Sequence, residues 1–204
     1  MKLNNDLVIF DLETTDCNEN YIIEIGAVYL NRENEIIGSY DGLITPPVPI
    51  SQFVIDLTTL TNEQLTNEGL FPAEGLEEFE SWVAKYSGSN LKKPRLCAWG
   101  TYFDSRVLRA EYKRQNRDYA FSGTMIDIKS LAFLWAALSG HRTDSFTVEK
   151  MAEEYMKMPP LEGAHYHRAN YDALRTAQIY QRIVKDLTSG MFLDDGKLAK
   201  IVFE

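Results

Sequence analysis

The sequence predicts an α/β domain, built on a mixed five-stranded sheet that is flanked by helices. Three neighbouring strand-like runs near the N-terminus are typical of hairpin-connected antiparallel strands, and the later alternation of strand and helix patterns is typical of parallel strands. The chain has 204 residues, of which 45% are hydrophobic and 25% charged. These values suit one globular domain and exclude a disordered chain.

The first three strands are predicted from short apolar runs rich in β-branched and aromatic side chains. They cover residues 7–10, 21–30 and 35–45. A turn near Glu33 joins the second and third strands, and a proline-rich stretch that starts at Pro46 ends the third. Two further strands are expected at residues 95–99 and 125–128, each followed by a helix pattern.

The helices are predicted from apolar residues at helical spacing. They cover residues 75–86, 104–117, 128–138, 148–155 and 170–187. Thr61 and Gln64 form a capping-box pattern that opens one more short helix. We expect one domain over residues 1–204 with a core at 7–187. The tail, residues 188–204, holds either a short strand or a segment that docks on the domain.

Charge and cysteine content narrow the possible partners. The net charge is −9, which disfavours a large basic surface for gripping duplex nucleic acid. Metal ions held by acidic clusters would reverse the charge locally. Two cysteines and three histidines fit neither a disulfide framework nor a zinc site, and we expect Cys97 in the core. No apolar run suggests a membrane partner or a signal peptide, so we expect a cytoplasmic protein.

Four carboxylates stand where elements of the predicted sheet begin or end. Asp11 and Glu13 lie two residues apart after the first strand, so both side chains face one site. Asp104 and Asp172 are expected at the start of helices, and His167 lies five residues before Asp172. Oxygen ligands of this kind suit Mg²⁺. An N-cap role is the plainer reading of Asp104 and Asp172, and it is compatible with metal binding.

Three motifs in this order resemble a known family. They are IFDLETT at 9–15, WGTYFD at 99–104 and HRANYDA at 167–173. They resemble the DEDDh branch of the 3′→5′ exonucleases, which have the ribonuclease-H-like fold. The stretch 56–65 is similar to a Leu-Thr-x-Ile-Thr segment of many relatives. Trp99-Gly100, before the second-motif Asp, resembles the branch that contains histone-mRNA 3′ exonucleases and sporulation-inhibitor-like exonucleases. Many relatives have His-Asn where this chain has Trp99-Gly100, so substrate contacts there differ.

The resemblance implies a hydrolytic site with two Mg²⁺ (or Mn²⁺) ions. By analogy, Asp11 bridges both ions, Glu13 and Asp172 complete the first, and Asp104 holds the second. His167 takes the proton of the attacking water, since an unperturbed imidazole pKa of about 6.5 suits a general base. The substrate implied is the 3′ end of single-stranded DNA or RNA, and the product a nucleoside 5′-monophosphate.

The resemblance also implies substrate contacts. Leu12 and Thr14 match positions that wall the pocket for the terminal nucleotide, and Phe103 lies beside the second motif. Four cations are candidates to guide phosphates: Arg106, Arg109, Lys113 and Arg168. The plainer readings are a solvated helix face for the cations of residues 106–113 and a core position for Phe103. The same core reading applies to three tryptophans, Trp82, Trp99 and Trp135.

The other two histidines are not expected in the catalytic site, and two further functions are considered. We expect His165 to have a supporting role or none, and we assign no role to His141. A non-catalytic binding module and a proofreading or trimming subunit of a larger assembly are the alternatives to an independent exonuclease. No residue separates DNA from RNA, because that choice rests on contacts to the 2′-OH. The oligomeric state is likewise open.

Overall fold

The computed structural model describes residues 3–16, 20–144, 146–161 and 166–189, and the backbone of two short strands beyond them. Five strands form the main sheet in the order β3-β2-β1-β4-β5. Their bounds are β1 (Leu7–Thr14), β2 (Ile22–Leu30), β3 (Ile36–Leu43), β4 (Arg95–Ala98) and β5 (Met125–Asp127). The β1–β2 and β2–β3 pairs are antiparallel, whereas β1–β4 and β4–β5 are parallel. The predicted mixed sheet is confirmed.

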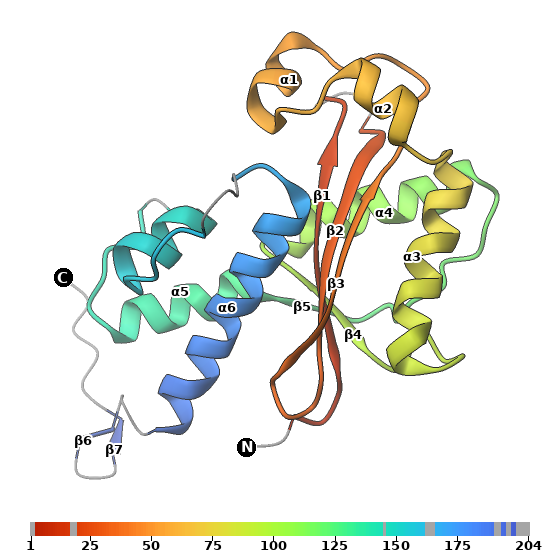
Figure 1. Ribbon diagram of the computed structural model, residues 1–204. Helices are drawn as coiled ribbons and strands as arrows, with labels where there is room; N and C mark the ends of the chain where they lie inside the picture. Colours follow the sequence, from red (N-terminus) through yellow and green to blue (C-terminus); the bar gives the residue numbers. More distant parts are fainter. Residues whose placement is uncertain are drawn as a thin grey trace.

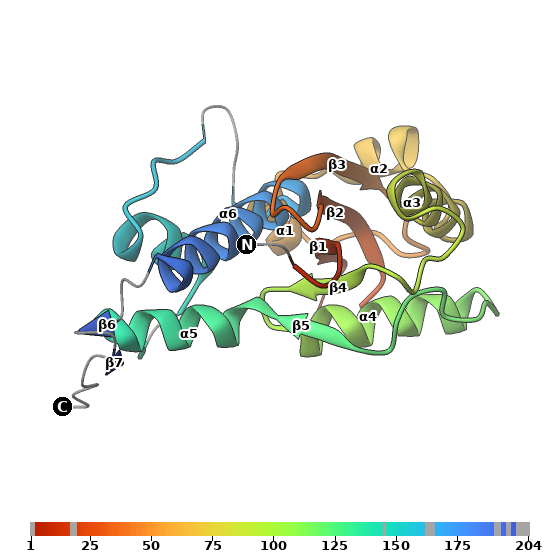
Figure 2. The same ribbon diagram turned by 90° about the horizontal axis from the view of Figure 1, so that it is seen from below.

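Helices cover both faces of this sheet. They are α1 (Gln52–Thr58), α2 (Asn62–Glu68), α3 (Pro72–Ser87), α4 (Thr101–Arg114), α5 (Ile128–Leu138), the π-helix η1 (Lys150–Tyr155) and α6 (Ala169–Thr188). In Figure 1, α1 and α2 form a small lobe above the ends of β1 and β2. Figure 2 shows α3 and α4 on one side of the strands and α5 and α6 on the other.

Each face of the sheet has its own apolar core. Phe79 and Tyr112, from α3 and α4, pack with strand residues on one face. Ala173 and Ala177 of α6 pack with Cys97 on the other face. Cys97 is fully buried, which confirms its predicted place in the core, and burial raises the pKa of its thiol. Side chains of β1 pack into both cores, one on each face of the sheet. This packing fixes the end of β1, where Asp11 and Glu13 lie.

Several helix boundaries differ from the prediction. The sequence did not predict α1, a helix of seven residues whose N-cap is Ser51. Helix α4 begins at Thr101 with Gly100 as its N-cap, and the N-cap of α6 is Arg168. The predicted N-cap positions of Asp104 and Asp172 are therefore wrong, although both lie in the first turn.

The short helix α2 shows half of the predicted capping box. The hydroxyl oxygen of Thr61 accepts a hydrogen bond from the backbone N–H of Gln64 at 3.0 Å. The Gln64 side chain instead donates to Glu68, one turn further on. The predicted helix at 148–155 is present but continues as a π-helix from Lys150.

The C-terminal tail is described only in part. Two short strands, β6 (Leu193–Asp194) and β7 (Lys197–Leu198), pair antiparallel. The rest of the predicted tail after Ser189 lies outside the described residues, as does His165. None of the helices in the described part of the chain combines the length and apolar character that crossing a bilayer requires.

Candidate active site

The end of β1 positions two of the predicted carboxylates. In the β1–β2 ladder, Asp11 lies opposite Gly26 and Glu13 lies opposite Glu24. Leu12, between the two acids, is 5% exposed and packs in the core of the α3–α4 face. Because side chains alternate along a strand, Asp11 and Glu13 face the α5–α6 side together.

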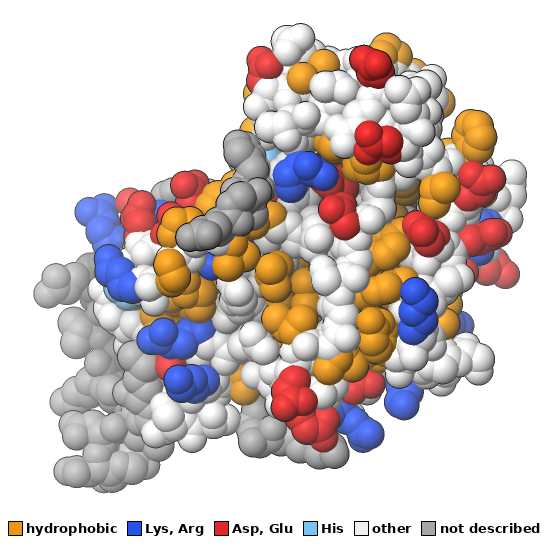
Figure 3. All heavy atoms as spheres, in the orientation of Figure 1, with side chains coloured by type: hydrophobic (Ala, Val, Ile, Leu, Met, Phe, Trp, Pro, Cys, Tyr) orange, Lys and Arg blue, Asp and Glu red, His pale blue; other side chains and the backbone are white. Residues whose placement is uncertain are grey.

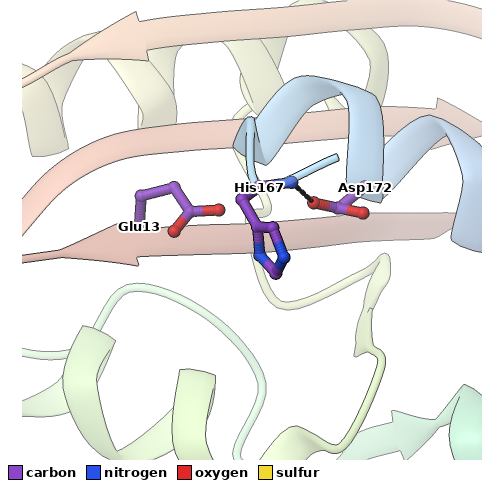
Figure 4. Close-up of side chains that lie close together, drawn as sticks. All are labelled: Glu13, His167 and Asp172. Atoms are coloured by element: carbon purple, nitrogen blue, oxygen red, sulfur yellow. Dashed lines mark hydrogen bonds between the residues drawn. The ribbon is translucent and has the colours of Figure 1, made fainter. Parts of the chain in front are cut away.

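The start of α6 brings a histidine and a third carboxylate to the same place. His167 has a left-handed backbone with φ of 65°, and its N–H donates to Oδ2 of Asp172 at 2.7 Å. Figure 4 shows the exposed His167 imidazole between the carboxylates of Glu13 and Asp172. One ligand atom from each of these three residues lies within 4.8 Å of the other two. This donor set could hold a divalent cation.

Burial and mutual repulsion raise the pKa values of these carboxylates. Burial raises the pKa of Asp11 most, followed by the charges of Asp104, Glu13 and Asp172. The pKa of Glu13 rises to about 8, mainly through burial and then through the charge of Asp172.

Asp104 is buried, with 4% of its surface exposed, and its charge is one of those that raise the pKa of Asp11. Burial raises its pKa to about 7, and the backbone N–H groups of Asp104 and Leu12 partly oppose this rise. Clustered oxygen donors that repel one another in the free protein fit a site for hard cations such as Mg²⁺, whose charge offsets the repulsion. The predicted acids therefore converge, and their assignment to individual metal ions stays a prediction.

A fully buried glutamate, which the sequence analysis missed, fixes the start of α6. Oε1 of Glu24 accepts from Nε and Nη2 of Arg168 at 2.9 and 2.6 Å, and Oε2 accepts from the N–H of Ala169 at 2.9 Å. Beside it, a Cβ added at Gly26 would lie 2.0 Å from the backbone of Ala169 and Asn170. We name Glu24, Gly26 and residues 167–172 the α6 corner. One signal was available: a single acid inside the apolar run YIIEIGAVYL requires a partner.

The carboxylates open into a cleft of about 400 Å³. Residues of β1 and of the α6 corner line one side of it. Seven further residues line it, and four of them we name the open wall: Trp99, Lys129, Phe146 and Glu149.

The Trp99 and Phe146 rings stack with their centroids 5.7 Å apart. Trp82 and Trp135 are buried as predicted, whereas Trp99 is only partly buried, so its core assignment is wrong in part.

Of the predicted substrate residues, Leu12 lines this cleft, whereas the others lie outside its described lining. Phe103 is 39% exposed, and the Arg106 guanidinium lies 6.0 Å from the centre of its ring. Arg109 lies over the Tyr119 ring at 4.0 Å, and Lys113 is exposed on α4. Their contacts with substrate stay predictions, as do those of Leu12, Thr14 and Arg168.

Comparison with known proteins places this fold and site among nucleases. The family model described as "Exonuclease" matches residues 8–180. The PolC-type DNA polymerase III of Latilactobacillus sakei is 30% identical over 185 residues, which are 89% of this chain and 11% of the relative. The Bacillus subtilis PolC-type polymerase is 28% identical over 182 residues, with similar coverage. The chain thus spans about a tenth of these relatives.

Solved structures show the same fold. The nuclease domain of 3′hExo, described as a DEDDh family member bound to rAMP, has a TM-score of 0.73 and 21% identity, covering 89% of this chain and 92% of that one. Cell-death related nuclease 4 has a TM-score of 0.76 and 20% identity, covering 89% of this chain and 64% of that one.

A mixed α/β domain with converging carboxylates at the end of its first strand defines a nuclease of the ribonuclease-H-like class. The chain belongs to the exonuclease family. The resemblance predicted from the three motifs is confirmed.

Proposed function

We propose that this domain is a divalent-metal-dependent 3′→5′ exonuclease that shortens single-stranded DNA or RNA from the 3′ end. The observation that carries the proposal is the convergence of Asp11, Glu13, Asp104 and Asp172 beside the exposed imidazole of His167. Family membership supports the reaction class. The acidic donor set supports two Mg²⁺ or Mn²⁺ ions, held as the motif analogy assigns them.

The chain's own residues supply the proton transfer and the positioning. When bound, a pair of ions would stabilise the attacking and leaving oxygens of the displacement. The imidazole of His167 accepts the proton of the attacking water, whose oxygen forms the new bond to phosphorus while the bond to the 3′ oxygen breaks. The bond from the His167 N–H to Asp172 fixes the base relative to that carboxylate. The products are a nucleoside 5′-monophosphate and a strand with a new 3′-OH.

The shape of the cleft and the similar proteins support the proposed substrate class. A cleft of about 400 Å³ with an aromatic stack on one wall suits one strand whose bases can stack. On the face shown in Figure 3, Lys and Arg side chains of the described residues lie in small groups among acidic ones rather than in one continuous basic patch. Proteins with a similar fold were solved with rAMP, a ribonucleotide, and with duplex DNA that has a 5′ overhang. DNA and RNA are therefore both substrates to test.

A degradation assay tests the proposal. Single-stranded DNA and RNA of matched sequence, labelled at the 5′ end, are incubated with the protein and Mg²⁺, Mn²⁺ or EDTA. We expect a ladder that shortens from the 3′ end, requires metal and disappears in His167→Ala. Intact strands with both metals, or a ladder of internal cuts, would contradict the proposal.

A proofreading role is the second candidate, because the curated relatives are PolC-type polymerases. A proofreading enzyme removes a mispaired 3′ nucleotide faster than a paired one. The test compares primer-templates that differ only in the last base pair. Equal rates on both would favour an independent trimming enzyme.

The domain bounds, the cellular location and the partner are also proposals. We retain one domain over residues 1–204, with the motif-bearing core at 7–187, and a cytoplasmic location. The strand of nucleic acid is the one partner proposed.

A further inference from the structure

One basic side chain faces the acidic cleft. Among the described residues that line the cleft, Lys129 is the only lysine or arginine, and it shares the cleft with Asp11, Glu13, Asp172 and Glu149. The Lys129 side chain is exposed, and no hydrogen bond or ion pair joins its ammonium group to the described part of the chain. Its ammonium group is therefore available to a ligand in the cleft.

The backbone around Lys129 is held firmly. Oδ1 of Asp127, the N-cap of α5, accepts from the N–H of Gly100 at 3.0 Å and from the N–H of Lys129 at 3.1 Å. Oδ2 of Asp127 accepts from the Ser130 hydroxyl at 2.6 Å. Asp127 thereby ties the loop after β4 to the start of α5.

The same arrangement directs the Lys129 stem. Gly100 has φ of 86°, and a Cβ added there would lie 3.9 Å from Cδ of Lys129. The stem therefore passes close to the Gly100 backbone, next to Trp99 in the cleft wall.

Helix stability does not explain a lysine here. Lys129 is the second residue of α5, at the helix end whose unpaired N–H groups carry partial positive charge. A cation in this first turn is unfavourable, whereas an acid would be favourable. A solvated helix face thus accounts for the exposure of Lys129 but not for its charge.

We infer that Lys129 binds a phosphate of the nucleic-acid strand in the cleft, an inference that rests on the proposed function. The phosphodiester is an anion that must enter among several carboxylates, and its negative charge increases as water attacks. A lysine in the lining of the same cleft supplies a charge-assisted hydrogen bond to a non-bridging oxygen. The phosphate is either the scissile one or the next one along the strand.

Two substrates distinguish binding of the scissile phosphate from binding of the neighbouring one. The first is a single-stranded oligonucleotide, and the second is the p-nitrophenyl ester of thymidine 5′-monophosphate, which has the scissile phosphate alone. Lys129→Gln should lower kcat/KM on the oligonucleotide by about 10- to 100-fold. An equal loss on the ester assigns the scissile phosphate. A loss confined to the oligonucleotide, seen mainly in KM, assigns the neighbouring phosphate.

Binding gives a readout that does not depend on turnover. In a His167→Ala background, a labelled oligonucleotide is titrated over a range of salt concentrations. Lys129→Gln should reduce the slope of log K against log[salt] by about 0.7, the value for one contact to a single strand. Lys129→Arg should keep the slope. The matched control is Lys92→Gln, an exposed lysine outside the cleft, which should change neither slope nor kcat/KM.

The outcomes distinguish this inference from the proposed function. If the wild-type protein cleaves the oligonucleotide and Lys129→Gln matches it in kcat/KM and in salt slope, the Lys129 inference alone is wrong. If the wild-type protein neither cleaves nor binds the strand, both are wrong.

Discussion

The α6 corner and the open wall, which both line the cleft, are built in different ways. The α6 corner is held by a buried carboxylate, by three hydrogen bonds to Glu24 and by direct backbone contact at Gly26. On the open wall, Lys129 and Glu149 are exposed, and the partly buried rings of Trp99 and Phe146 stack on each other. Chemistry requires groups held within a fraction of an ångström, whereas a strand of varied bases requires a tolerant surface. The corner suits the first task and the wall the second.

The largest expected effect comes from Asp11 of β1, which lines the cleft beside the α6 corner. Asp11→Asn should lower kcat by at least about 10³-fold, because it removes the ligand proposed to bridge both ions. The same change should stabilise the metal-free protein, because it removes a charge from a repelling cluster. Cleavage rates and thermal unfolding in EDTA measure the two effects. A variant that loses both activity and stability would indicate misfolding instead.

The next prediction separates the role of the His167 imidazole as general base from the effect of its left-handed backbone conformation. His167→Ala should lower kcat by about 10²- to 10³-fold with little change in KM. Because φ is 65° at this position, alanine adds backbone strain of about 1 kcal/mol that glycine avoids. His167→Gly should therefore be as inactive as His167→Ala but more stable. Activity retained in both variants would remove His167 from the proposed mechanism.

The ion pair of the corner can be dissected with a double-mutant cycle. Arg168→Gln should destabilise the protein by about 3 kcal/mol, because it leaves the fully buried Glu24 without its partner charge. Adding Glu24→Gln should recover part of that loss in denaturant unfolding.

The same variants test the sequence-based role of Arg168. If Arg168 also guides phosphates, the double variant will regain stability but keep a raised KM. Full recovery of both stability and KM would restrict Arg168 to its structural pairing with Glu24.

The raised pKa values predict how the metal-free protein responds to pH. The pKa of Glu13 is about 8 in the fold against an ordinary value of 4.5, so the fold favours its protonated form. The stability that this group contributes is present below its ordinary pKa and is lost as pH rises through about 8. In EDTA, Tm should therefore fall between pH 5 and pH 9. Mg²⁺ should raise Tm more at pH 9, and Glu13→Gln should flatten the profile.

The smallest effect is expected at the aromatic stack of the open wall. Phe146→Leu keeps an apolar side chain but loses the ring that stacks on Trp99. Since such pairs contribute about 0.5–1.5 kcal/mol, KM should rise by about 2- to 10-fold while kcat stays unchanged. Steady-state kinetics on one oligonucleotide checks this. A larger loss in kcat than in KM would show that the wall also positions the reacting groups.

Local patterns were sufficient to predict the sheet and the acids of the site. The apolar side chains in β1, β2 and β3 form runs that are recognisable from the sequence of each strand alone. The two-residue spacing of Asp11 and Glu13 places both side chains on the same face of β1. The predicted helix over residues 128–138 matches α5. Helix starts were less accurate, because Gly100 and Arg168 cap α4 and α6 without a side-chain hydrogen bond.

The missed residues depend on contacts between distant segments. Glu24 pairs with a residue 144 positions away, and its partner becomes evident only from the packing of α6 on β2. Lys129 reaches the cleft because Asp127 joins α5 to the loop after β4. No local pattern in the sequence marks either relationship, although an acid within an apolar strand and a lysine in a first helical turn are both anomalies.

Hydrolysis in ¹⁸O-labelled water, followed by mass spectrometry of the products, tests the central claim most directly. A strand cleaved with Mg²⁺ should release nucleoside 5′-monophosphates that carry one ¹⁸O in the phosphate, and the shortened strand should end in an unlabelled 3′-OH. Asp11→Asn should release none. Products that carry a 3′-phosphate, or 5′-monophosphates without the label, would contradict attack of water on phosphorus at this site.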